Sequence, residues 1–143
     1  MRHAAGSFSV RPAPANSRTG SVTILTMKKS HFENATPILR VEDLDASLRF
    51  YVDQLGFRNA DWAMEDFTCV SRDAASVYLC RRGQGAGKAW VWMGVESVRD
   101  LREELLAAGV TLRMEPTNYP WALEMHVEDP DGNVIRFGSE PEA

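Results

Sequence analysis

An approximate internal repeat constrains the fold of this chain more than any other feature. The stretch "VEDLDASLRFYVDQLGF" at 41–57 resembles "VESVRDLREELLAAGV" at 95–110, at an offset of about 54 residues. Each copy begins with Val-Glu and continues with a capping residue, an apolar pattern, a glycine and a hydrophobic residue. Self-similarity of this kind indicates that one structural unit is used more than once. We therefore expect two equivalent modules.

Both copies have the pattern of a capped amphipathic helix. In the first copy Asp43 can cap the N-terminus and Gly56 ends the helix. In the second copy Ser97 is the capping residue, Asp100 stands where it can complete a capping box, and Gly109 ends the helix. The apolar residues of the first copy recur on one helical face, and they are Leu44, Leu48, Tyr51, Val52 and Leu55.

Each predicted helix follows one strand-like segment and precedes three more. The preceding segments are "TPILRV" and "AWVWMGV". The following ones are "RNADWAM", "DFTCVSR" and "SVYLCRR" in the first copy, and "VTLRMEP", "ALEMHVE" and "NVIRFG" in the second. "DPDGN" between the last two strands is a hairpin signal. The sequence predicts an α+β fold of two tandem βαβββ modules, at about 35–84 and 87–139, that form a curved mixed sheet.

Length and composition indicate one globular domain, which we place at 31–143 of the 143 residues. Residues 1–30 lack a hydrophobic period and are expected to be a disordered tail. This arginine- and serine-rich segment either loosely resembles a transit peptide or precedes a true start at Met27. No uninterrupted apolar stretch is long enough to span a membrane. Cys69 and Cys80 have no ligand spacing, which favours reduced core thiols in a cytoplasmic protein.

Charge is distributed unevenly along the chain. Three of the 16 basic residues, Arg2, Arg11 and Arg18, precede Met27, which leaves 13 basic and all 20 acidic residues from Met27 onward. A surface this acidic repels the phosphates of nucleic acid and favours cationic ligands. We therefore expect a small-molecule ligand and no nucleic acid or membrane as partner.

The repeat, "VEDLDASLRFYVDQLGF" and the terminal "DPDGNVIRFG" resemble the vicinal-oxygen-chelate superfamily, which includes glyoxalase I, extradiol dioxygenases and bleomycin-resistance proteins. The stretches "AWVWM", "MEDFTCVSRD" and "PWALEMHVEDPDGNVIRF" are most similar to the bleomycin-resistance proteins. The resemblance implies a homodimer that binds a cationic glycopeptide in clefts between subunits, without a metal or other cofactor. It also implies that a proline in the first strand, here Pro37, helps to exchange an N-terminal arm between subunits.

The enzymes of this superfamily hold a divalent metal on the concave face of the sheet, and the resemblance locates their ligands here. The expected positions hold Thr36, Trp90 and Arg136. An arginine has no lone pair to give a metal and repels it. On the predicted strand at 122–128, Glu124 and His126 share one face, where they form either a two-ligand metal site or a polar pair in which Glu124 bridges to Arg136. We expect no metal and no catalytic residue.

Tryptophans are the main candidates for ligand contact. Trp90 and Trp92 have the same strand parity, and the resemblance puts them in the concave face, where indoles suit flat aromatic groups. Trp121 either lines the ligand cleft or anchors its loop. Trp62 is expected at the cleft rim or the dimer contact, whereas Phe67 shares parity with Cys69 and fits the core equally well. The clustered Asp61, Glu65 and Asp66 either attract a cationic ligand or serve solubility.

Together these features predict a non-catalytic protein that binds and sequesters a bleomycin-like, cationic aromatic antibiotic. Its predicted ligand-binding residues are Trp90, Trp92, Trp121, Trp62, Phe67, Glu124, His126, Arg136, Asp61, Glu65 and Asp66. One alternative is a metal-dependent glyoxalase- or dioxygenase-type lyase or oxygenase that uses His126 and Glu124. Another is a partner-binding module in which the tryptophans form a protein interface.

Overall fold

The computed structural model describes residues 29, 31 and 33–143, of which residues 36–143 form one compact unit. The sequence predicts a disordered tail at 1–30 and leaves open a start at Met27. Both predictions fall almost entirely on residues 1–28, which lie outside the described part of the chain. Among the described residues, no helix is both long and apolar enough to cross a membrane.

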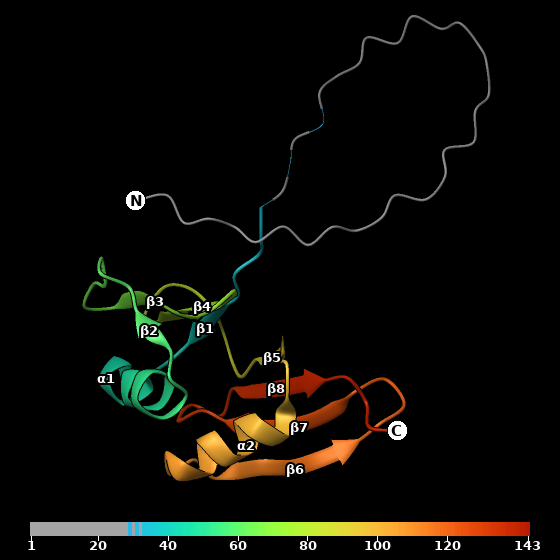
Figure 1. Cartoon of the computed structure of the whole chain (residues 1–143). Helices are drawn as coiled ribbons and strands as arrows, with labels where there is room; N and C mark the ends of the chain where they lie inside the picture. Colours follow the sequence, from blue (N-terminus) through green and yellow to red (C-terminus); the bar gives the residue numbers. More distant parts are fainter. Residues whose placement is uncertain (1–28, 30, 32) are drawn as a thin grey trace, which may run out of the picture. The chain divides into compact units, whose positions relative to one another are not determined.

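The first module forms a four-stranded mixed sheet with a helical segment on one face (Figure 1). Its elements are β1 (Ile38–Arg40), α1 (Leu44–Leu48), the π-helix η1 (Arg49–Gln54), β2 (Arg58–Asn59), β3 (Phe67–Arg72) and β4 (Ala75–Cys80). The strand order is β1-β4-β3-β2, with β1 parallel to β4 and the other pairs antiparallel.

One predicted strand of this module is much shorter than expected. The pattern "RNADWAM" predicts a strand through Met64, but β2 ends at Asn59. The backbone then turns, because the amide of Ala63 donates to the carbonyl of Ala60 and the amide of Met64 donates to the carbonyl of Phe67. Trp62 and its acidic neighbours therefore lie on a loop and not on the sheet.

The second module repeats this arrangement. Its elements are β5 (Trp90–Gly94), α2 (Val98–Ala107), β6 (Leu112–Asn118), β7 (Leu123–Glu128) and β8 (Val134–Ser139). The strand order β5-β8-β7-β6 matches that of the first module position by position. The prediction of two βαβββ modules is confirmed, with the difference that each module forms its own sheet, so that one chain contains two four-stranded sheets.

The predicted helix boundaries are also confirmed. The side chain of Asp43 accepts a hydrogen bond from the amide of Ala46 at 3.1 Å, and that of Ser97 accepts one from the amide of Asp100 at 3.1 Å. These caps satisfy amides that have no partner inside a helix. Gly56 follows the first helical segment with φ of 74°, a left-handed conformation that favours glycine.

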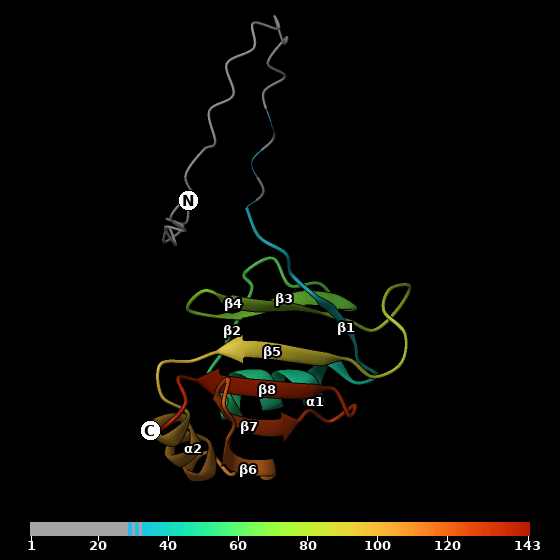
Figure 2. The same ribbon diagram turned by 90° about the vertical axis from the view of Figure 1, so that its right-hand side faces the viewer.

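One hydrophobic core lies between the two modules. Alternation along the strands sends one face of each sheet inward, for example Val70 of β3, Leu79 of β4 and Ile135 of β8, all fully buried. The helices cover the same core with residues such as Tyr51 and Leu105. Because both inner faces contribute to one core, the outer faces of the two sheets point away from it (Figures 1 and 2).

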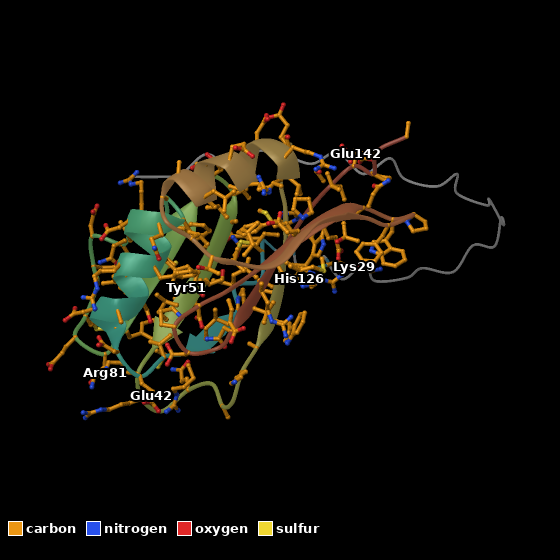
Figure 3. The ribbon with its side chains drawn as sticks, turned by 90° about the horizontal axis from the view of Figure 1, so that it is seen from below. Lys29, Glu42, Tyr51, Arg81, His126 and Glu142 are labelled. Atoms are coloured by element: carbon orange, nitrogen blue, oxygen red, sulfur yellow. The ribbon has the colours of Figure 1, made fainter. Side chains whose placement is uncertain are left out.

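A buried polar cluster joins the modules at the predicted hairpin of residues 129–133. The Tyr51 hydroxyl, which Figure 3 shows in the interior, donates to Asp129 Oδ2 at 3.0 Å. Asp129 also accepts from the amide and the side chain of Asn133, each at 2.8 Å. Asp131 Oδ1 accepts from the amide of Glu42 in the first module at 2.9 Å. The turn therefore connects the end of β1 and η1 to the second sheet.

Candidate ligand-binding face of the second sheet

Trp90 and Trp92 lie on the outer face of β5. They are 55% and 53% exposed. On the opposite face, Met93 is buried in the core, and Val91 and Val95 pack against it. The predicted parity of this strand is therefore confirmed. Tryptophan side chains are largely buried on average in folded proteins, because leaving their large apolar area in water is unfavourable. Two exposed indoles on the same face of one strand make this surface a candidate for contact with a ligand or a partner.

Trp92 is held in a fixed orientation by what lies beneath it. Its Nε1–H donates to Glu124 Oε1 on β7 at 3.3 Å. A side chain added at Gly138 would place its Cβ only 2.6 Å from Cζ2 of the indole, and one added at Gly94 would lie 3.1 Å from Cζ3. The indole thus occupies space that only glycine leaves open on β5 and β8. One face of Trp92 rests on the sheet, and the residue's exposed area is available for stacking.

Glu124 is the buried centre of this face. Only 2% of the residue is exposed, and Nη2 of Arg136 donates to both of its carboxylate oxygens, at 2.7 and 2.8 Å. Burial raises the pKa of the Glu124 carboxyl, but hydrogen bonds and charge from Arg136, with the hydrogen bond from Trp92 and the nearby Trp121 indole, outweigh it and leave the pKa below its ordinary value. The bridge between Glu124 and Arg136, one of the two sequence-based interpretations, is present.

His126 completes the face two residues along β7. Its Nε2 lies 3.7 Å from Glu124 Oε2, and its ring meets that of Trp90 edge-on, with centroids 5.6 Å apart. Burial lowers the pKa of His126, and the charges of Arg136 and Arg113 act in the same direction, against the opposing effect of the nearby Glu124 carboxylate. The imidazole is therefore neutral at neutral pH.

Arg113 of β6 is a member of this face that the sequence did not suggest. Its guanidinium lies 5.0 Å from the centroid of the Trp90 ring, and it pairs with Glu128 at 3.3 Å. The strand register of β6 and β7 shifts between Leu112 and Met114, which brings this side chain over the indole. Strand alternation alone does not reveal such a bulge. Gly138 was missed as well, since only the Trp92 geometry shows its importance.

Trp121 stands between β6 and β7 and is 65% exposed. Its ring stacks on Tyr119 with centroids 4.8 Å apart and planes 8° apart. Its indole is near enough to Glu124 to contribute, after Arg136 and Trp92, to the lowered pKa of that carboxyl. Both sequence-based roles of Trp121 are therefore compatible with the geometry: the stack anchors the loop, and the indole borders the same face as Trp92.

A second aromatic group lies on the outer face of the first sheet. Trp62 stacks on Phe67 at 6.0 Å between centroids, and Phe67 stacks on Tyr78 at 5.1 Å. Phe67 shares its side of β3 with Cys69, as predicted, and this side faces outward. Phe67 therefore does not lie in the core, which was one of its two predicted positions. Asp61 and Glu65 are exposed on the same loop as Trp62, whereas Asp66 pairs with Arg81 at 3.1 Å.

The structure thus sorts the predicted residues into two groups. Trp90, Trp92, Trp121, Glu124, His126 and Arg136 meet on the second sheet. The remaining predicted residues, Trp62, Phe67, Asp61, Glu65 and Asp66, belong to the first module. Within the described residues, no hydrogen bond, ion pair or ring stack links the two groups. Because the outer faces of both sheets point away from the common core, one chain does not enclose a single cup.

Two hollows of the protein surface lie outside these two groups of aromatic side chains. One of about 560 Å³ is lined by carboxylates and apolar residues around α1 and includes Glu42 and Arg81, which lie side by side in Figure 3 and are joined by a 3.0 Å hydrogen bond. Another of about 470 Å³ lies between α2 and the β3–β4 turn. Neither of these two hollows is lined by an indole.

The metal that the fold brings to its enzyme members does not fit these residues. The positions that the resemblance assigns to the ligands of this metal hold Thr36, Trp90 and Arg136, none of which suits a divalent cation. Both oxygens of Glu124 are already engaged by a guanidinium. Across the described ranges of the chain, no three His, Cys, Asp or Glu side chains come together as a possible metal site. The side chains of this face therefore support no reaction step through a metal.

Comparison with known proteins identifies the family. Residues 30–137 match the model of the Glyoxalase/Bleomycin resistance protein/Dioxygenase superfamily. The chain belongs to this superfamily. A search of curated proteins finds no match.

Solved structures with this fold include both binding proteins and an enzyme. A bleomycin-binding protein from bleomycin-producing Streptomyces verticillus, in complex with copper(II)-bleomycin, is 28% identical over 80% of this chain and 100% of its own, with a TM-score of 0.67. TnmS3, an antibiotic-binding protein from Streptomyces sp. CB03234, is 25% identical over 78% and 100%, with a TM-score of 0.64. A lactoylglutathione lyase from Agrobacterium tumefaciens, 16% identical over 78% and 96% with a TM-score of 0.65, shares the fold alone.

Proposed function

We propose that this protein binds a planar aromatic antibiotic reversibly and sequesters it, without making or breaking a bond. The observation that carries the proposal is the row of exposed indoles on the second sheet, Trp90, Trp92 and Trp121. The similarity to two antibiotic-binding proteins supports the ligand class. Two free thiols, Cys69 and Cys80, fit a reducing compartment, and we place the activity in the cytoplasm.

Stacking on these indoles is strong enough to contribute materially to sequestration. An aromatic pair contributes about 0.5–1.5 kcal/mol beyond the burial of its area. Micromolar affinity corresponds to about 8 kcal/mol. Two or three stacked rings supply a part of this, and burial of the indole surface and polar contacts supply the remainder after the cost of association.

We further propose that the site is completed in a homodimer. β1 and β5 each lie at an edge of their sheet, and an exposed edge is a template for pairing with another chain. Pairing of β1 with β5 of a second copy would join the two sheets into a continuous curved one. The aromatic group of Trp62 and Phe67 would then face the indoles of the other copy. Asp61, Glu65 and Asp66 would form an acidic rim that attracts a cationic ligand.

The experiment is a titration of the protein with metal-free bleomycin, followed by tryptophan fluorescence and calorimetry. We expect saturable quenching at about one ligand per subunit, and affinity reduced at least tenfold in Trp90→Ala, since loss of one stacked, buried ring exceeds about 1.4 kcal/mol. Leu106→Ala is the control, because Leu106 is exposed on α2, away from the indoles. Equal affinity of wild type and Trp90→Ala would contradict the proposed site. Absence of binding at millimolar concentration would exclude bleomycin as the ligand.

A further inference from the structure

Arg136 presents a guanidinium to solvent above a hidden carboxylate. The side chain of Arg136 is 36% exposed, whereas that of Glu124 is 3% exposed. Glu124 engages only Nη2, through both of its oxygens. The pair is therefore asymmetric: the acceptor lies beneath the surface and the donor faces outward. A guanidinium held in this way is fixed in orientation and keeps its other N–H groups for a second acceptor.

Two nitrogen atoms at this spot lack a partner. Nε of Arg136 and Nε2 of His126 are buried, and neither has a hydrogen-bond partner among the described residues. No described residue accepts a hydrogen bond from Nη1 of Arg136 either, since its bonds run only through Nη2. Buried polar groups without partners are uncommon in folded proteins and cost about 1–3 kcal/mol each. Because Nε and Nε2 are covered, the donor that a ligand can reach is Nη1, on the part-exposed side chain of Arg136.

The surroundings disfavour a cation at the same point. The guanidinium of Arg113 already lies over the ring of Trp90. This face of the ring, which could attract a ligand cation, is therefore occupied by a cation of the protein itself. The two acidic residues of β7 on this side are both paired, Glu124 with Arg136 and Glu128 with Arg113. The accessible charged group opposite Trp92 is therefore the guanidinium of Arg136.

We propose that the ligand of this face carries an oxyanion on its ring system, of the carboxylate or phenolate kind, which Arg136 binds while the ring stacks on Trp92. This inference rests on the proposed function and specifies its ligand. Any positive group of the same ligand would lie at the acidic loop of Asp61 and Glu65 in the first module, away from Arg136. Arg136 would then determine specificity, and Glu124 would position it.

Three naphthalene probes that differ in one substituent test the proposal. They are naphthalene-2-carboxylate, neutral 2-naphthylmethanol and 2-naphthylmethylammonium, each titrated into wild-type protein with tryptophan fluorescence and ligand-observed NMR. We expect the carboxylate to bind about tenfold tighter than the ammonium, which corresponds to one charge-assisted hydrogen bond. The double variant Glu124→Gln/Arg136→Gln, in which an amide pair replaces the ion pair, should lose this preference.

Two further variants separate binding from folding. Arg136→Lys keeps the charge but not the planar fork, and should retain the order of the probes with a smaller ratio. Arg102→Gln on α2, where Arg102 pairs with Glu103 and Glu115, should behave as wild type. Circular dichroism confirms that each variant is folded.

The outcomes distinguish this inference from the proposed function. Equal binding of all three probes, a preference for the ammonium, or a carboxylate preference that survives in the folded double variant would overturn the role of Arg136 and leave stacking on the indoles intact. Failure of all three probes to bind at millimolar concentration would overturn this inference, whereas the bleomycin titration decides the proposed function independently.

Discussion

At the scale of single residues, Gly138 matters because of what lies above it. A methyl group there would sit 2.6 Å from Cζ2 of Trp92, so Gly138→Ala must displace the indole and its hydrogen bond to Glu124. We expect a loss of about 1–3 kcal/mol in the free energy of unfolding, as for other overpacked sites. In the Trp92→Ala background the same substitution should cost much less, and urea unfolding of the four proteins measures this coupling. Equal costs in both backgrounds would mean that the indole does not rest on the glycine.

Glu124 gives the protein a predictable dependence on acid. Its pKa is below the ordinary glutamate value in the folded state, so the stabilisation it provides is fully present above that ordinary value and is lost as the pH falls through the lower folded-state pKa. Glu124→Gln should flatten the stability profile in this acidic range. At neutral pH it should destabilise the fold by less than the about 3–5 kcal/mol of a fully buried broken pair, because Arg136 is partly exposed. Urea unfolding from pH 3 to 7 provides the profile, and an unchanged slope would contradict the account.

At the scale of elements, the turn of residues 129–133 connects the modules through Tyr51. Tyr51→Phe removes the hydroxyl that donates to Asp129 Oδ2, and Asp129 keeps its bonds from Asn133. We expect the free energy of unfolding to fall by about 1.5–3 kcal/mol, the usual range for a hydrogen bond to a charged group. Tyr119→Phe is the matched control, because the Tyr119 hydroxyl contacts only Met114 Sδ at 3.7 Å. Equal stability of wild type and Tyr51→Phe would show that the turn is not held by this bond.

The elements themselves could be predicted from the sequence where local chemistry determines them. Caps at Asp43 and Ser97 and the hairpin at 129–133 depend on neighbouring residues, and all appear in the structure. The loop around Trp62 could not be predicted, because its turn hydrogen bonds compete with a strand of similar composition. The apolar pattern also did not predict the π-helix of Arg49–Gln54. This helix buries Phe50 as well as Tyr51, although Phe50 does not belong to the predicted apolar face.

The candidate site could be predicted only in part, for a similar reason. Strand parity put Trp90 with Trp92 on one strand and Glu124 with His126 on another, and the contacts of the structure bring these two pairs to the same face. The contributions of Arg113 and Gly138 depend on a bulge and on one indole's orientation, which the spacing of residues does not encode. The separation of Trp62 and Phe67 from the indoles of the second sheet depends on how two modules share a core.

At the scale of the whole molecule, the open aromatic faces predict self-association. We expect wild-type protein to sediment as a dimer at micromolar concentration. Ile38→Asp should shift it toward monomer, because Ile38 is an exposed apolar residue on the outer side of edge strand β1. Leu106→Asp, an equally exposed apolar position on α2, is the control and should leave the dimer intact. Wild-type protein that stays monomeric at high concentration would contradict the dimer and require each face to bind alone.

The central claim is that a planar ligand stacks on the outer face of the second sheet. The most direct test follows the indole N–H signals of Trp90 and Trp92 by two-dimensional NMR during a titration with metal-free bleomycin, with each signal assigned by a single Trp→Phe variant. If the ligand stacks on this face, both signals shift together and saturate at one ligand concentration, with the Trp92 signal reporting on its bond to Glu124. Binding that leaves both signals unmoved would place the ligand elsewhere and contradict the account.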